Sequence, residues 1–556
     1  MQVNKDKCRS IQINADRCGR MLKDTIAMKY ILTADIGTTA LKTALYSQDG
    51  DFIAGCSREY AFVTPEPGQA ELAAEVYTET FAAGIQSLLS DTGIDPSDIG
   101  VIGFSTQGET MLLLDEQDRP LRRAVLWCDT RATAEAAEIA EHFGLKEIRE
   151  HTGQVGADPI WPGAKLLWIR RHEPEVFEKT ARIVQLEGWF SLLLTGRAAG
   201  EDSILGSSVY FDIRTRTYWQ QMLEYLGIRR EQLPDILLPG AIVGQVTAEG
   251  AERFGLAKGT QVSIGGIDLA VGAVGVGNIR PGNFSDVTGS ALCTMAMTDH
   301  IILDPAGEMP CYCSAVPGLY MIHAYATGGM CLRWFRDVFY KESEKQSEKE
   351  SEKEAEAQGE GTEDEGMKDQ DRDGGGFNAY DRMDLLAADC PAGAEGLLAL
   401  PHLTGSGPPD LCPEMKGSLI GLTPAHGQKH IIRALMEGVA MILCRVLEAT
   451  EGLGLTADRI VCLGGGAKSP VWCQIKADAT GREIVTTDGY ENAGCLGAAM
   501  LAGTAAGMFP SLEEAVDRLV REDRRYLPDP DKAAVYQKLR KQYHELMNCL
   551  LPVFRR

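Results

Sequence analysis

Runs of apolar residues alternate along the chain with segments that have the pattern of amphipathic helices. Apolar runs that end in small or acidic residues predict strands at 30–37, 101–106, 261–268, 284–289 and 459–466. Apolar residues that recur every three or four positions predict helices at 75–89 and 430–452. Strands that alternate with helices are typical of an α/β fold. Because 556 residues exceed what one hydrophobic core usually serves, we predict two large domains.

Two segments lack this pattern. Residues 1–27 show no apolar periodicity, and we expect a disordered N-terminal extension there, with a basic docking segment as the alternative. Residues 341–376 are almost entirely charged or small polar residues, with an excess of acidic over basic side chains. Such a segment cannot bury enough apolar surface to offset its loss of conformational entropy. We predict an acidic, low-complexity insertion at the surface of the second domain.

Charge and cysteine usage narrow the class of protein. Acidic residues outnumber basic ones 79 to 55, which gives a formal charge of -24. Nucleic acids and anionic membranes carry the same sign of charge, so neither is an expected partner. The fifteen cysteines include no CxxC pair, which favours reduced thiols over a metal site or a disulfide framework. No apolar stretch approaches a signal sequence or a membrane span. We expect a cytoplasmic protein, and a homodimer is compatible with the sequence.

Three loops indicate a nucleotide site. The first loop, residues 35–39, reads DIGTT and offers a carboxylate, hydroxyls and backbone amides that suit Mg²⁺ and phosphate. The second loop, residues 287–291, reads VTGSA and repeats the strand–turn–strand design. The glycine turn, residues 463–469, leads from a strand into a helix and permits close approach of a nucleotide. Two similar loops, one in each half, indicate a duplicated fold that closes over a nucleotide.

With these loops, the chain resembles the FGGY family of carbohydrate kinases, members of the actin-like ATPase superfamily. The resemblance runs from about residue 29 to residue 550. It also rests on the motifs GFSTQGET, LWCDTRA, GGIDLAVGAVGVG and LGGGAKSPVWCQIKADATG, which follow the family order. The resemblance implies an α/β protein with two actin-like ATPase (RNase H-like) domains flanking a catalytic cleft. The sugar-binding N-terminal domain would span residues 28–275, and the nucleotide-binding C-terminal domain residues 276–550.

The resemblance also implies roles for individual residues. Asp268 would be the general base that takes the proton from the sugar hydroxyl, and Asp35 would hold the magnesium of Mg–ATP. A carboxylate suits the first role because phosphoryl transfer requires mainly positioning, charge neutralisation and a proton acceptor. ATP and Mg²⁺ are therefore the expected cofactors. The residues expected to hold ATP are Thr38, Thr39, Thr288, Gly289, Ser290, Gly464, Gly465, Gly466, Ala467 and Ser469.

The sugar would contact Asp268 and a group of polar and aromatic side chains. These candidates are Gln107, Glu109, Asp129 and Trp161. For Asp129 a scaffold role is the alternative, and for Trp161 the alternative is core packing. Glycerol kinases carry an arginine at the position of Gly108, so its absence predicts space for a larger substrate. Leu269 stands where relatives often carry a polar residue, so one contact to a substrate hydroxyl is expected to be missing or supplied from elsewhere.

The flanking motifs resemble those of xylulokinases more than those of glycerol kinases. The expected reaction is transfer of the γ-phosphate of ATP to a primary hydroxyl of a small sugar, most simply a ketopentose such as xylulose or a related ketose. Two alternatives stay open. One is a polyol kinase acting on glycerol- or erythritol-like compounds, and the other is a non-catalytic, nucleotide-dependent sugar sensor.

Overall fold

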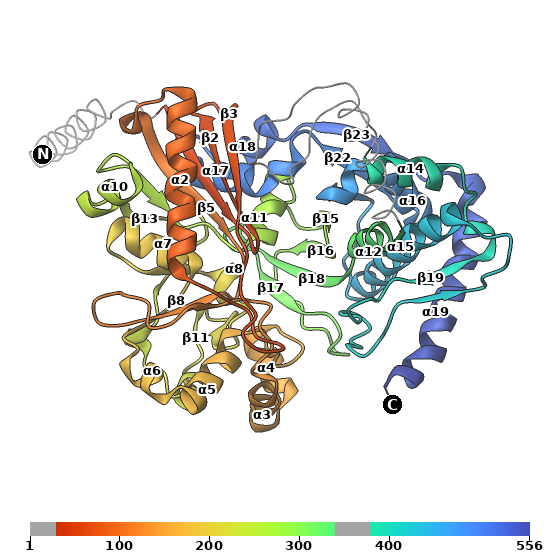
Figure 1. Cartoon of the computed structure of the whole chain (residues 1–556), viewed down its shortest axis with the longest axis horizontal. Coiled ribbons are helices and arrows are strands. Elements are labelled where there is room, and N and C mark those ends of the chain that lie inside the picture. The colour runs from red at the N-terminus through yellow and green to blue at the C-terminus, as the bar shows by residue number, and fades with distance from the viewer. Residues whose placement is uncertain (1–28, 340–377, 556) are drawn as a thin grey trace, which may run out of the picture.

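The computed structural model describes residues 29–339 and 378–555. The predicted N-terminal extension at 1–27 and the predicted insertion at 341–376 lie outside the described residues. Figure 1 shows two lobes next to each other, the first built mainly from the N-terminal half and the second mainly from the C-terminal half. Each lobe is built around one large sheet.

The sheet of the first lobe has six strands in the order β13-β14-β5-β1-β2-β3. Strands β1, β2 and β3 are antiparallel neighbours, β5 and β14 continue the sheet in parallel, and β13 closes it antiparallel. All eight residues of β5 are buried, as expected for a central strand covered on both faces. The strands are β1 (Tyr30–Ile36), β2 (Ala40–Ser47), β3 (Phe52–Glu59), β5 (Ile99–Thr106), β13 (Ile242–Gln245) and β14 (Gln261–Ser263).

The sheet of the second lobe has seven strands in the order β17-β18-β16-β15-β21-β22-β23. Its central part repeats the first sheet, because β18, β16 and β15 are antiparallel neighbours, β21 and β22 continue in parallel, and β23 closes antiparallel. This repetition supports the predicted duplicated α/β design. The strands are β15 (Phe284–Thr288), β16 (Ala291–Thr298), β17 (Cys311–Cys313), β18 (Tyr320–Thr327), β21 (Arg459–Leu463), β22 (Glu483–Thr487) and β23 (Glu522–Tyr526).

Four smaller sheets and the helices complete the described structure. The short strands are β4 (Glu71–Leu72), β6 (Met111–Leu114), β7 (Ala124–Val125), β8 (Arg182–Gln185), β9 (Ala199–Glu201), β10 (Phe211–Asp212), β11 (Thr217–Tyr218), β12 (Asp235–Leu237), β19 (Leu398–Leu400) and β20 (Ser418–Ile420). The helices of the first half are α2 (Ala74–Thr92), α3 (Thr133–Phe143), α4 (Leu145–Thr152), α5 (Pro162–His172), α6 (Pro174–Lys179), α7 (Leu186–Thr195), α8 (Asp202–Leu205), α9 (Gln220–Leu226), α10 (Ala248–Phe254) and α11 (Asp268–Gly275). Those of the second half are α12 (Met330–Phe339), α14 (Ala379–Ala388), α15 (Gln428–Gly452), α16 (Pro470–Thr480), α17 (Ala493–Ala505), α18 (Leu512–Leu519) and α19 (Ala533–Phe554).

Helices α11 and α17 join the two lobes. Helix α17 comes from the second half of the chain but packs on β1 and β5 of the first sheet, and it also contacts α11. The two helices approach at backbone distance, because a Cβ at Gly497 would lie 2.0 Å from the Val271 carbonyl oxygen. A Cβ at Gly275 would lie equally close to the Ala493 carbonyl oxygen. Only glycine fits at these two positions.

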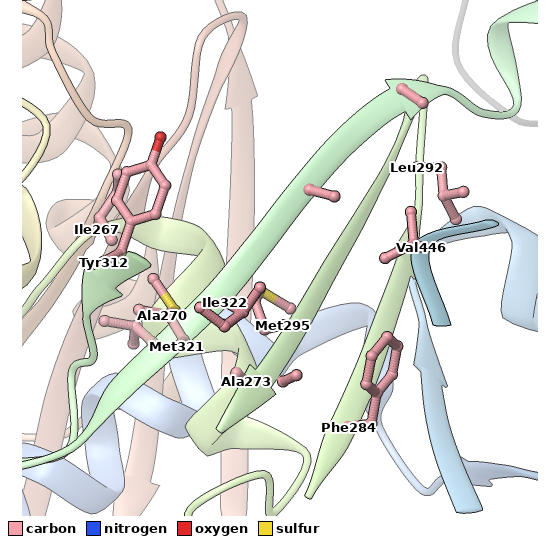
Figure 2. Close-up of a cluster of buried hydrophobic side chains, with 14 of the residues drawn as sticks. Ile267, Ala270, Ala273, Phe284, Leu292, Met295, Tyr312, Met321, Ile322 and Val446 are labelled. Carbon is pink, nitrogen blue, oxygen red and sulfur yellow. The ribbon is translucent and has the colours of Figure 1, made fainter. Parts of the chain in front are cut away.

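The main hydrophobic cluster extends from α11 into the second sheet. Figure 2 shows Ala270 and Ala273 of α11 near Met295, Met321 and Ile322 of strands β16 and β18. All five side chains are buried. The small apolar residues after Asp268 thus form a helix that packs in the core. None of the helices in the described ranges is both long enough and apolar enough to cross a membrane.

Candidate active site

The first loop follows β1, and Asp35 lies near the carboxyl end of that strand. Ser105 of β5 donates from Oγ to Asp35 Oδ1 at 2.7 Å. Lys42 is the cross-strand neighbour of Asp35 on β2. Burial raises the pKa of Asp35, whereas the Ser105 hydrogen bond and the Lys42 charge lower it in part. The arrangement keeps a carboxyl group in a secluded position with one cation nearby.

The two threonines of the first loop differ in their surroundings. The Thr38 hydroxyl accepts a 2.7 Å hydrogen bond from the indole Nε1 of Trp127, whose side chain is 38% exposed. Thr39 is exposed, and its carbonyl accepts from the backbone N–H of Tyr60 at 2.8 Å. The loop is therefore fixed by contacts from β3 and from the LWCD segment, while the Thr39 side chain remains free to meet a ligand.

Asp268 opens α11. The backbone N–H of Leu269 donates to its Oδ1 at 2.7 Å. Burial, then the charge of Asp35, raises the pKa of Asp268 to about 7, and the charge of Glu109 adds to this rise. A carboxyl group with a pKa near neutrality is well suited to accept a proton. The neighbouring thiol of Cys293 is not, because burial and the Asp268 charge raise its pKa to about 12.

Glu109 lies close enough to Asp268 for its charge to raise the pKa of that carboxyl. Its backbone φ of 54° is in the left-handed region, which a glutamate adopts at a cost of about 1 kcal/mol or more. The Gln185 side chain holds this conformation by accepting the Glu109 N–H at 3.0 Å. Burial raises the pKa of Glu109 to about 7, while Ser207 and Lys165 lower it in part. Strain of this kind is typical of functional sites.

Gln107 has a supporting position. Its side chain is 2% exposed and donates from Nε2 to the Gly37 carbonyl at 2.9 Å and to the Tyr77 hydroxyl at 3.1 Å. Its Oε1 accepts from Thr110 Oγ1 at 3.2 Å. With both ends of the amide engaged by the protein, we assign Gln107 to the support of the first loop instead of to the sugar.

Asp129 and Trp161 also lie in the scaffold. Asp129 is fully buried and accepts hydrogen bonds from the Ala70 N–H and from the Arg131 guanidinium, which leaves no exposed oxygen for a sugar. The Trp161 indole is 5% exposed and belongs to the main hydrophobic cluster. The structure thus favours the alternatives for both residues, a scaffold ion pair and core packing.

The prediction of free space at Gly108 is wrong. A Cβ at this position would lie 2.5 Å from Ile267 Cδ1, so the isoleucine beside Asp268 fills the volume that a side chain at 108 would occupy. Because Ile267 is apolar and 2% exposed, this wall of the site offers no hydrogen bond. A larger substrate gains no room there.

In the second loop, one of the residues expected to bind ATP has a buried side chain. Thr288 is 1% exposed, accepts from Lys476 Nζ at 2.6 Å and donates to Asp286 Oδ1 at 2.8 Å. Lys476 also forms a fully buried ion pair with Asp286. The Thr288 hydroxyl is therefore unable to meet a phosphate, contrary to the prediction. Gly289 and Ser290 stay available, because space around Gly289 is open and Ser290 is exposed.

The start of α12 completes the second loop, and sequence reasoning missed it. The Ser290 carbonyl accepts the N–H groups of Gly328 at 3.1 Å and Met330 at 3.0 Å, and the Gly289 carbonyl accepts that of Gly329 at 2.8 Å. A Cβ at Gly329 would lie 2.6 Å from the Gly289 carbonyl oxygen. The available signal was a pair of glycines directly before a helix.

The glycine turn packs against the second loop. Gly464 has a φ of 80°, and its missing Cβ would lie 3.0 Å from the Thr288 carbonyl oxygen. Gly466 packs on the Thr288 side chain in the same way, whereas Gly465 faces open space. The two loops therefore form one continuous surface, with Gly465 and Gly289 at its open positions.

The last two predicted residues of the glycine turn are structural in this arrangement. Ala467 is 5% exposed. Ser469 caps α16 by accepting the Trp472 N–H at 3.0 Å, and it donates to Asp384 Oδ1 at 2.7 Å. Trp472 is buried and donates to the Met436 carbonyl, so it packs in the core.

Three further residues near Glu109 escaped the sequence analysis. The Lys165 side chain is 0% exposed, donates to the Leu126 carbonyl at 2.6 Å, and has its pKa lowered to about 8 by burial. Burial raises the pKa of Asp158, and burial together with the charges of Asp158 and Glu109 raises that of Tyr325 to about 12. Asp158 and Lys165 lie three positions before and four positions after Trp161, the one residue of this segment that the sequence analysis singled out. Tyr325 reaches the site from the second lobe, which no local pattern indicated.

The residues present fit a magnesium ion that arrives with a nucleotide. In the described part of the chain no three His, Cys, Asp or Glu side chains cluster as a complete metal site. Mg²⁺ bound with ATP needs only one or two carboxylates in addition to phosphates and water. A Cβ at Gly494 would lie within 2.9 Å of both Asp35 carboxylate oxygens, so glycine at 494 leaves this carboxylate open.

Comparisons with known proteins agree with this geometry. Models of the FGGY family of carbohydrate kinases match residues 30–275 with the N-terminal domain and residues 287–506 with the C-terminal domain. The chain is 28% identical to the xylulose kinase of Bacillus subtilis (strain 168) over 95% of its own length and 100% of the relative's. It is 29% identical to the gluconokinase of Bacillus licheniformis over 94% and 96%.

A solved structure gives the same result for the fold. The crystal structure of xylulose kinase from Rhodospirillum rubrum superposes with a TM-score of 0.81 at 27% identity, covering 95% of this chain and 100% of that one. The predicted two-domain, actin-like ATPase fold is thereby confirmed. The chain belongs to the FGGY family of carbohydrate kinases and is a phosphotransferase with an alcohol group as acceptor.

Proposed function

We propose that the chain transfers the γ-phosphate of ATP to a primary hydroxyl of a small neutral sugar, with a ketopentose such as xylulose or a related ketose as the first candidate. The observation that carries the proposal is the buried Asp268 carboxyl, whose pKa of about 7 depends on burial and on the charges of Asp35 and Glu109. Those two neighbours belong to the loops expected to hold the metal and the sugar. The base would therefore lie where both substrates meet.

Asp268 would act as the proton acceptor. As the sugar oxygen bonds to the γ-phosphorus, the hydroxyl proton passes to the Asp268 carboxylate and the bond from phosphorus to the β–γ bridging oxygen breaks, releasing ADP. Such transfer depends mainly on positioning and charge stabilisation. The 2.7 Å bond from the Leu269 N–H to Oδ1 fixes the orientation of the carboxylate and leaves Oδ2 for the substrate.

Asp35 would hold Mg²⁺, whose charge offsets that of the phosphates. Lys42 supplies a second cation close to the first loop, since it lies across from Asp35 and donates to the Glu491 carbonyl at 3.0 Å. Thr39, Gly289, Ser290 and Gly465 would meet the nucleotide, because they are the predicted ligands that remain exposed or face open space. Thr38 would act with Trp127, which holds its hydroxyl.

The charges of the sugar site favour a neutral substrate over gluconate. Glu109, Asp158 and Asp268 are all acidic and lie close enough to act on one another or on Tyr325. The cation nearest to Glu109 is Lys165, but its ammonium group is buried and already bonded to the Leu126 and Trp127 carbonyls. Among the described residues whose charges act on Glu109, a substrate carboxylate would meet the acidic Asp158 and, as a cation, only the buried ammonium of Lys165. Neutral hydroxyls can donate to the same groups.

The test is ADP release from ATP across a panel of sugars. We expect stimulation by at least one ketopentose, with kcat/KM about 100-fold or more above that for gluconate. Glycerol and erythritol in the same panel examine the polyol alternative. A preference for gluconate would overturn the charge argument, and no stimulation by any sugar would favour the sensor.

Asp268→Asn tests the mechanism in the same assay. The variant should lose sugar-dependent ADP release while keeping its thermal midpoint and its binding of Mg–ATP, because the substitution is isosteric. Retained turnover would show that another group is the base.

A further inference from the structure

The helix that carries Asp268 begins without a cap of its own. The N-cap residue of α11 is Ile267, whose side chain makes no capping hydrogen bond. Helix N-termini prefer Ser, Thr, Asp or Asn at this position, because the first N–H groups of a helix lack partners within it. The Leu269 N–H bond orients the Asp268 carboxylate locally, but Ile267 gives the start of α11 no side-chain cap.

Ser203 supplies that contact. The backbone N–H of Ile267 donates to Ser203 Oγ at 3.1 Å, although the two residues are 64 positions apart. The hydroxyl also contacts the preceding residue, since a Cβ at Gly266 would lie 3.0 Å from it. On the other side, the Gly266 carbonyl accepts the Thr106 N–H at 3.1 Å, which ties the same turn to the end of β5. The peptide before Asp268 is held from both sides.

Glu201 orients the Ser203 hydroxyl. Its carboxylate accepts the Ser203 hydroxyl proton at 2.7 Å, the Ser203 N–H at 2.7 Å and the Ile204 N–H at 2.6 Å. Glu201 and Ser203 are both 0% exposed. Because the hydroxyl has one proton and gives it to Glu201, its lone pairs face the Ile267 N–H.

We propose that Ser203, oriented by Glu201, is a positioning residue that fixes the start of α11 and thereby the catalytic carboxylate of Asp268. The inference rests on the proposed role of Asp268 as the base. Glu201 is the N-cap residue of α8, and its side-chain hydrogen-bond partners, Ser203 and Ile204, lie at the beginning of that helix. The same carboxylate therefore caps α8 and orients the hydroxyl that contacts the turn before Asp268.

A matched pair of variants isolates the hydroxyl. Ser203→Thr keeps the hydroxyl, and Ser203→Val has nearly the same shape as threonine without it. We expect Ser203→Val to lower kcat by about 10-fold to 100-fold relative to Ser203→Thr, because small displacements of a reacting group cost rates of this order. The KM for Mg–ATP should differ between the two by less than about twofold, since Ser203 contacts none of the three nucleotide loops directly and two of them, the second loop and the glycine turn, lie in the other lobe.

The outcomes separate this inference from the proposed function. Equal kcat values for Ser203→Val and Ser203→Thr would overturn the positioning role even if both are less stable than the wild type. A parallel fall in kcat and rise in the KM for Mg–ATP would also overturn it, because general loosening of the fold affects both substrates. If the valine variant does not fold, Ser203→Ala replaces it in the comparison. Turnover by Asp268→Asn would instead contradict the proposed base.

Discussion

The activity of the wild-type kinase should rise with pH through the ionisation of Asp268. Burial and the charge of Asp35 raise the pKa of this carboxyl from its usual 3.8 to about 7. The rise corresponds to about 4 kcal/mol between the two protonation states, at about 1.4 kcal/mol for each pKa unit. A base must be ionised to accept a proton, so at about pH 6 only about one molecule in ten would be competent. Below neutrality, kcat/KM should fall about tenfold for each further pH unit.

The assay is ADP release with the preferred sugar between about pH 5.5 and about pH 8.5. Mg²⁺ is in excess and ATP is kept at a low concentration, so that the pH profile of kcat/KM reports the ionisation of the free enzyme. Asp268→Asn should lower kcat/KM by a factor of about 10² to 10⁴ above neutral pH, and its difference from the wild type should narrow at lower pH, where Asp268 of the wild type is protonated. Asp118→Asn, which changes a partly exposed carboxylate paired with Arg182, is the matched control and should keep the wild-type profile. Equal kcat/KM at about pH 6 and about pH 8 would refute the reasoning, because a base with an ordinary pKa is fully ionised at both.

Three other predictions address the supporting contacts. Burial and the charge of the neighbouring Glu201 raise the pKa of the Glu187 carboxyl well above its usual 4.5. The contribution of Glu187 to the stability of the folded state is therefore complete below about pH 4.5 and is lost as the pH rises through the raised pKa. Glu187→Gln should therefore reduce the fall of the thermal midpoint at alkaline pH by about 2 °C or more. A pH dependence of melting equal to that of the wild type would contradict this. Trp127→Phe removes the hydrogen bond to Thr38, which is worth about 1 kcal/mol, and should raise the KM for Mg–ATP about fivefold. A wild-type KM in steady-state assays would exclude a role of Trp127 in holding Thr38 for the nucleotide. Lys476→Met leaves Asp286 buried without its cation and should lower the free energy of unfolding in urea by about 3 to 5 kcal/mol, with a smaller loss when Asp286→Asn is added.

The parts of the site that could be predicted from the sequence are encoded by short local motifs. The first loop and the segment around Asp268 each combine a strand, a turn and a chemically active side chain within a few residues, so one short pattern predicts all three together. The apolar runs likewise predicted five strands of the two large sheets, because each of these strands is a continuous run of mostly buried residues. These features depend on neighbours in sequence.

Contacts between distant segments decided the rest. Thr288 was a sound candidate for phosphate from its loop, but Lys476, 188 positions away, binds its hydroxyl. Gly108 indicated space, but the space is taken by Ile267. In each case the deciding partner is distant in sequence: Lys476 lies on α16, and Ile267 lies directly before α11. No spacing within the motif encodes such a partner.

The glycine contact between α11 and α17 has a consequence for how the lobes can move. Because backbone meets backbone there, with no side chain between the helices, the contact can act as a fulcrum but leaves little room for sliding. Asp268 begins one of these helices, and Gly494, at the beginning of the other, lies against Asp35. A rotation about this point would displace the rims of the lobes much more than it displaces the two carboxylates. The cleft could therefore admit and release substrates while the pair of acids at its pivot keeps its spacing.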